Sequence, residues 1–166
     1  MNQGKYVFSQ MVSHLGRNHF NYLTRKYDGN KYVKHLSCWN QLLAMMFGQL
    51  SNRESLRDVV VAWEAHHSKC KFLGIGSKPI AKTTLASANQ NRDYRIFEDF
   101  AFYMMKEACE KRAINLKWLK QHFKIKKFWG TTENAVRIQI AVAIITYCIV
   151  DIVPHDMKLG SSTYEV

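Results

Sequence analysis

With 166 residues, the chain is long enough for one domain with a hydrophobic core, or for one domain with an appendage. Lysine and arginine outnumber aspartate and glutamate by 24 to 13, which gives a formal net charge of +11 and an isoelectric point near 9.6. This balance indicates a polyanionic partner, and nucleic acid is the usual one for a soluble intracellular chain; a merely basic surface is the alternative.

The four cysteines are scattered along the chain, and no Cys-x-x-Cys pair is found among Cys38, Cys70, Cys109 and Cys148. We interpret them as reduced thiols of a cytoplasmic protein, and the N-terminus MNQGKYVF lacks the apolar run of a secretion signal. His66, His67 and Cys70 form the one cluster with ligand-like spacing, but no second pair completes the four ligands of a zinc site. We therefore expect no metal site.

No segment alternates apolar and polar residues as a half-buried strand does, so the periodicity predicts an all-α fold. A first short apolar stripe consists of Phe8, Met11, Val12 and Leu15. A second stripe, Phe20, Leu23 and Tyr27, precedes a turn at Asp28-Gly29-Asn30.

Two closely connected helices are predicted next. Ser37 is expected to cap a helix whose apolar residues run from Trp39 to Leu50, and Ser51 with Glu54 forms a capping-box pattern for the following helix. The second helix has Leu56, Val59, Val60 and Trp63 on one side, with Arg53, Arg57 and Glu64 left to water. With a short helix between Pro79 and Arg92, this pair predicts a helix-turn-helix-like element.

The short helix has the composition of a DNA-contacting segment, because hydroxyls, amides and cations surround a small apolar side. Its candidate DNA-binding residues are Lys82, Thr83, Thr84, Ser87, Asn89, Gln90 and Arg92. Hydroxyls can donate to phosphates, and the amides and the guanidinium suit base edges. The alternative is that the hydroxyls cap the helix and the other groups are solvated surface.

A long amphipathic helix is predicted from Asp93 to Arg112, with Asn91 or Asp93 as its cap and its aromatic stripe in the core. Beyond it, cations alternate with aromatic residues, which suits binding to the DNA backbone. The lysines of this basic segment are Lys117, Lys120, Lys124, Lys126 and Lys127. A solvated basic helix face is the alternative.

Thr131 or Thr132 is expected to cap a final helix, and Pro154 to end it. Its apolar run, 138–153, is shorter than the about 20 residues of a membrane span, which favours a buried helix over a transmembrane one. The tail from 155 to 166 is expected to be frayed.

Two parts of the chain resemble bacterial insertion-sequence transposases of the DDE type. Residues 2–15, 29–60 and 77–108, from NQGKYVFSQMVSHL to YRIFEDFAFYMMKEA, resemble their N-terminal domain, and this resemblance covers about two thirds of the chain. Residues 116–153, beginning LKWLKQHFKIKKFWG, resemble their C-terminal end. The resemblance implies domains at 1–112 and 113–154, followed by the tail.

The catalytic middle of that family is missing between the two parts. In the family, a glutamate precedes a Lys-Trp-Leu-Lys-Gln segment, and counting back from Lys117 and Trp118 puts it at Ala113. The RNase H-like core with two catalytic aspartates would also lie in between. The other candidate acidic residues are predicted to lie on polar helix faces, at helix caps or in a turn. They are Asp28, Glu54, Asp58, Glu64, Asp93, Glu98, Asp99, Glu107 and Glu110. We interpret the chain as an internally deleted transposase.

Phosphoryl transfer needs carboxylates that hold two divalent ions about 3.5–4 Å apart, so we expect no catalytic residue and no cofactor, whereas intact relatives would use magnesium. The resemblance implies binding to insertion-sequence ends without strand cleavage or joining, and no membrane partner. Two alternatives stay open. The chain could pair with itself or with intact transposase and inhibit its assembly, or it could be a decaying remnant without function.

Overall fold

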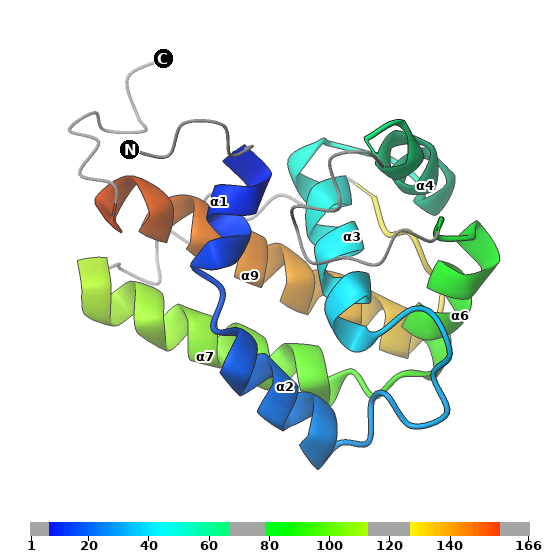
Figure 1. Ribbon diagram of the computed structural model, residues 1–166, viewed down its shortest axis with the longest axis horizontal. Coiled ribbons are helices and arrows are strands. Elements are labelled where there is room, and N and C mark those ends of the chain that lie inside the picture. The colour runs from blue at the N-terminus through cyan, green and yellow to red at the C-terminus, as the bar shows by residue number, and fades with distance from the viewer. Residues whose placement is uncertain (1–6, 67–78, 113–126, 157–166) are drawn as a thin grey trace.

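The computed structural model describes residues 7–66, 79–112 and 127–156, and within these ranges it contains seven α-helices and no strand (Figure 1). The predicted all-α fold is confirmed. The helices are α1 (Val7–Ser13), α2 (Arg17–Lys26), α3 (Cys38–Leu50), α4 (Leu56–Ala65), α6 (Lys82–Asn91), α7 (Arg95–Arg112) and α9 (Glu133–Asp156).

Helices α7 and α9 pack against each other more extensively than any other pair of described helices, and they run side by side in the same direction (Figure 1). Helix α3 packs against α9 and α4, while α2 covers α7. Helix α6 lies at one end of this arrangement, where it contacts α4 and α9. The C-terminal helix therefore touches most of the N-terminal helices.

One continuous hydrophobic core crosses the expected boundary at residue 112. The predicted stripe of α7, which contains Ile96, Phe97, Phe100, Met104 and Ala108, is buried throughout. It shares one cluster with the buried side of α9, which includes Ile138, Val142, Ile145 and Ile149. Because this burial removes apolar area from water on both sides, the C-terminal segment and the N-terminal helices stabilise each other.

Serine caps start α3 and α4, but only one of them is the predicted residue. Ser37 caps α3 as expected, since its hydroxyl accepts a hydrogen bond from the backbone N–H of Asn40. The predicted capping box of Ser51 and Glu54 is wrong, because Ser51 ends α3 and donates to the carbonyl of Phe47. Helix α4 instead begins after Ser55, whose hydroxyl accepts from the N–H of Asp58. Each serine is followed three residues later by an acidic residue, Glu54 after Ser51 and Asp58 after Ser55. The capping pattern in the sequence therefore does not distinguish the two serines.

Helix α9 begins as predicted, with the Thr132 hydroxyl accepting from the N–H of Ala135, but it does not end at Pro154. It continues through Pro154 to Asp156. The stretch Glu133–Val153 is long and apolar enough to span a membrane by length and composition, and 61% of its most apolar window is buried against other helices. Burial of this extent is typical of a helix in the core of a folded protein.

Glycine allows the close approach of α3 and α4. A Cβ atom on Gly48 would lie 2.5 Å from Cγ2 of Val59 and 2.8 Å from Cη2 of Trp129. The indole of Trp129 donates to the carbonyl of Arg53 at 3.1 Å, so the segment that precedes α9 is fastened to the α3–α4 connection.

Candidate nucleic-acid interface

Helix α6 presents most of the predicted DNA-contacting side chains on one exposed face. Its apolar side is anchored in the core by Leu85 and Ala88, three residues apart. The exposed residues of the opposite face are Lys82, Thr83, Thr84, Ser87 and Gln90. Because the helix is held by its buried side, these five side chains remain on its solvent-exposed side.

Asn89 and Arg92 are placed differently from the other five predicted residues. The Asn89 side chain is buried, and its oxygen accepts a hydrogen bond of 2.7 Å from the side-chain amide of Gln41. The Arg92 guanidinium donates to the side-chain oxygen of Gln41 at 2.7 Å and to the carbonyl of Leu36. Both polar groups therefore tie α6 to α3 and to Leu36 just before it. Asn89 is buried and does not face solvent as the sequence interpretation required, whereas Arg92 is partly exposed at the edge of an open groove.

Burial changes the chemistry of this internal contact. Desolvation lowers the pKa of Arg92, which lies close to Cys38, and raises the pKa of the Cys38 thiol. Arg92 nevertheless remains charged, because arginine is effectively always protonated in proteins. Its hydrogen bonds to Gln41 and Leu36 offset part of the desolvation cost. Arg92 is a structural cation.

An open groove of about 720 Å³ lies between α6 and the loop that joins α2 to α3. Thr83, Thr84, Ser87 and Asn91 line its helical wall, while the loop contributes Lys31, Tyr32, Lys34 and His35. The loop had not been singled out in the sequence. Its two lysines on either side of an aromatic residue, within YDGNKYVKH, are a signal that could have indicated it.

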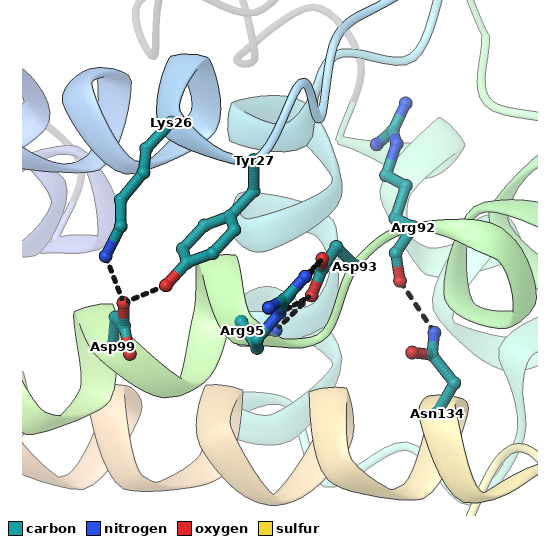
Figure 2. A network of polar contacts seen from close by, with 7 residues as sticks. All are labelled: Lys26, Tyr27, Arg92, Asp93, Arg95, Asp99 and Asn134. Carbon is teal, nitrogen blue, oxygen red and sulfur yellow. Dashed lines mark hydrogen bonds and ion pairs between the residues drawn. The ribbon is translucent and has the colours of Figure 1, made fainter.

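The acids that line this groove are neutralised by neighbouring cations. Arg95 holds Asp93 at 2.6 Å and, chiefly through this hydrogen bond, lowers the pKa of Asp93 (Figure 2). Asp28 lies 3.7 Å from Lys31. By contrast, Lys34 on the loop and Lys82 at the start of α6 make no ion pair with any residue that the structure describes. The groove therefore has a net positive charge.

Four of the five predicted lysines of the basic segment, Lys117, Lys120, Lys124 and Lys126, lie outside the described residues, as does Ala113. Lys127 is described and exposed, next to the half-exposed ring of Phe128. Trp129 packs inward, as its contact with Arg53 shows. The structure thus brings together the α6 set and the loop, while the basic segment is represented by Lys127 alone.

The acids of the described ranges do not form a metal-binding group. Asp99 of α7 accepts from the Tyr27 hydroxyl at 2.7 Å and pairs with Lys26, while Asp93 is occupied by Arg95 (Figure 2). Within residues 7–66, 79–112 and 127–156, no three His, Cys, Asp or Glu side chains are placed to hold one ion. His67 and Cys70, from the cluster with ligand-like spacing, lie outside these ranges.

Comparison with known proteins finds similarity over parts of the chain. Residues 3–76, which include α1 to α4, match a family described as a domain of unknown function, DUF4372. A stretch of 36 residues is 47% identical to y4zB, a Sinorhizobium fredii (strain NBRC 101917 / NGR234) protein named as a candidate transposase. This stretch is 22% of the chain and 10% of that relative's length. No solved structure matches the chain. This short stretch links the chain to a transposase by sequence similarity.

Proposed function

We propose that this chain is a transposase-derived protein that binds insertion-sequence DNA and does not cleave or join strands. Three independent features support the proposal: the similarity to a candidate transposase, the net charge of +11, and the exposed polar face of α6. The face of α6 carries the argument, because it is the one feature that specifies a binding surface.

This face has the groups that duplex recognition requires. Lys82 supplies a cation for a phosphate, and the hydroxyls of Thr83, Thr84 and Ser87 can donate to phosphate oxygens. Gln90 is exposed one turn after Ser87, and its amide has both a donor and an acceptor for the edge of a base. The buried contacts of Asn89 and Arg92 hold the helix that presents these groups. Sequence preference would therefore depend chiefly on Gln90.

The absence of strand chemistry is proposed from the carboxylates. The resemblance to DDE transposases places alanine, Ala113, where a catalytic glutamate is expected, and leaves no room for the core that carries two aspartates. Asp93, just before α7, pairs with Arg95, and Asp99 of α7 pairs with Lys26 and accepts from the Tyr27 hydroxyl. An internal deletion of a transposase gene accounts for all of these features.

The proposal is tested by the binding of the purified chain to two duplexes, one with the terminal sequence of the nearest intact element and one scrambled. We expect tighter binding to the terminal duplex, and a smaller preference in Gln90→Ala. Gln49→Ala, a change at the end of α3, is the control and leaves the preference unchanged. Equal affinity for both duplexes in the unchanged protein would contradict sequence recognition.

One observation favours pairing with another protein as a second function. An apolar groove between α7 and α9 is lined by Phe102, Met105, Ile140 and Ile144, and 61% of the Phe102 side chain is exposed. Such a surface can contact a second chain or an intact transposase. Co-purification with the intact enzyme, and its loss in Phe102→Asp, would support this function; co-purification that survives the substitution would contradict the role of the groove.

A further inference from the structure

The most exposed large apolar side chain among the described residues is Tyr32, in the wall of the groove beside α6. The residue is 91% exposed, and its backbone has a φ of 60°, a left-handed conformation that bulky residues rarely adopt. Neither feature stabilises the fold, because the ring covers no core residue and the backbone is strained. Strained positions of this kind cluster at functional sites, and the ring requires another explanation.

The loop holds Tyr32 on a stable base. The side-chain oxygen of Asn30 accepts from the N–H of Cys38 at 2.8 Å, which fastens the loop to the start of α3. The N–H of Gly29 donates to the carbonyl of Thr24 at 2.8 Å, and the N–H of Lys31 donates to Asp28 at 2.9 Å. Because these bonds order the loop before any partner arrives, little conformational freedom is lost when the ring makes a contact.

The surroundings of Tyr32 combine a π-face with cations and hydroxyls. The Lys31 ammonium lies 5.8 Å from the centre of the Tyr32 ring, and Lys34 follows two residues later. Thr83 and Ser87 face them across the groove. Aromatic rings that stack on bases, beside cations that follow the phosphates, are the recurring chemistry of single-strand binding. A volume of about 720 Å³ is within the range of sites that take drug-sized ligands, which are comparable to a nucleotide.

We propose that this groove binds a single-stranded DNA segment, with Tyr32 stacked on an unpaired base and Lys31 and Lys34 on the adjacent phosphates. The inference rests on the proposed DNA-binding function and adds a second substrate form to it. In a duplex each base is covered by its neighbours, so the face of the Tyr32 ring can reach only a base that is unpaired and unstacked. Duplex binding by the exposed face of α6 does not need this ring.

The test measures binding of the full chain to a fluorescent single strand that contains 2-aminopurine, and to the blunt duplex of the same sequence. Tyr32→Ala is expected to weaken single-strand binding by on the order of tenfold, as the loss of one base stack does, and to leave the preference for the terminal duplex over the scrambled one unchanged. Tyr32→Phe keeps the stacking face and the affinity. Tyr22→Ala removes another exposed tyrosine, 55% exposed on α2, and serves as the matched control.

Fluorescence of the 2-aminopurine base reports stacking directly, and we expect it to be quenched by the unchanged protein and by Tyr32→Phe but not by Tyr32→Ala. Tyr32→Gly relieves the left-handed backbone, so it should raise the melting temperature while it weakens single-strand binding, which separates stacking from folding. Single-strand affinity that is absent, or equal in Tyr32→Ala and Tyr22→Ala, would overturn the inference. The duplex measurements judge the proposed function separately, because terminal preference does not depend on Tyr32.

Discussion

The side-chain amide of Asn134, in the first turn of α9, donates to the backbone carbonyl of Asn89 at 2.8 Å. It also donates to the backbone carbonyl of Arg92 at 2.7 Å (Figure 2). These carbonyls lie at the C-terminal end of α6, where a helix has no partners of its own for them. The C-terminal helix thus satisfies the end of the helix that carries the proposed DNA-binding face. The orientation of that face depends on a residue about forty positions further along the chain.

Asn134→Ala should lower the free energy of unfolding by about 1–3 kcal/mol, because it leaves two partly buried carbonyls without their donor. Urea unfolding followed by circular dichroism measures the loss. Asn21→Ala, an exposed change on α2, is the control and should stay within about 0.5 kcal/mol of the unchanged protein. Equal stability of the two variants would show that the Asn134 contacts do not matter.

The start of α4 can be located by comparing two neighbouring substitutions. Ser55→Ala should cost about 1 kcal/mol, because it removes the hydroxyl that accepts from the N–H of Asp58. Glu54→Ala should have almost no effect, since Glu54 is exposed and is not the N3 residue of this helix. Chemical denaturation of both variants measures the two losses of stability. A larger loss in Glu54→Ala than in Ser55→Ala would support the capping box of Ser51 and Glu54 instead.

Gly48→Ala should destabilise the protein, although alanine is the better helix former. The added methyl group would meet Val59 at 2.5 Å, and overpacking of this kind costs about 1–3 kcal/mol, more than the about 1 kcal/mol gained in helix propensity. In a Val59→Ala background the same change should cost less. A double-mutant cycle of unfolding free energies measures the difference, and additive effects would exclude the contact as the cause.

The pair of Asp93 and Arg95 should make stability depend on acidity. The pKa of Asp93 in the folded protein lies below its ordinary value of 3.8, so the stabilisation is complete above that value and disappears as the pH falls through the folded pKa. The Asp93→Asn variant has no carboxylate at this position, so it has no such stabilisation to lose when the pH falls. The stability difference between the unchanged protein and Asp93→Asn should therefore be larger at about pH 6 than at about pH 2.5. A constant difference would contradict the assignment.

Lys82→Ala should weaken duplex binding and reduce the slope of log affinity against log salt by about 0.9, the contribution of one phosphate contact. Fluorescence anisotropy over a salt series gives this slope. Lys106→Ala removes an exposed lysine from α7, away from the α6 face, and should leave the slope unchanged. If both substitutions reduce the slope equally, the binding reflects overall charge and no defined face.

The sequence by itself determined the helices and most of the core. The apolar stripes of α3 and α7 repeat at helical spacing, and burial followed from that spacing because a regular helix turns every such residue to one side. Caps with one clear candidate, such as Ser37, were also readable. Where two serines competed, as at Ser51 and Ser55, local pattern could not decide between them.

The tertiary structure decided which polar residues are available to a ligand. Asn89 and Gln90 are adjacent amides of similar chemistry, yet Asn89 is turned inward to Gln41 while Gln90 faces water. The Gln41 partner comes from 48 residues earlier, so no local pattern contains the contact. The same reason explains Tyr32, since its position in a groove depends on the packing of α6 against the rest of the fold. Composition gives the kinds of groups, and long-range packing selects those that remain exposed.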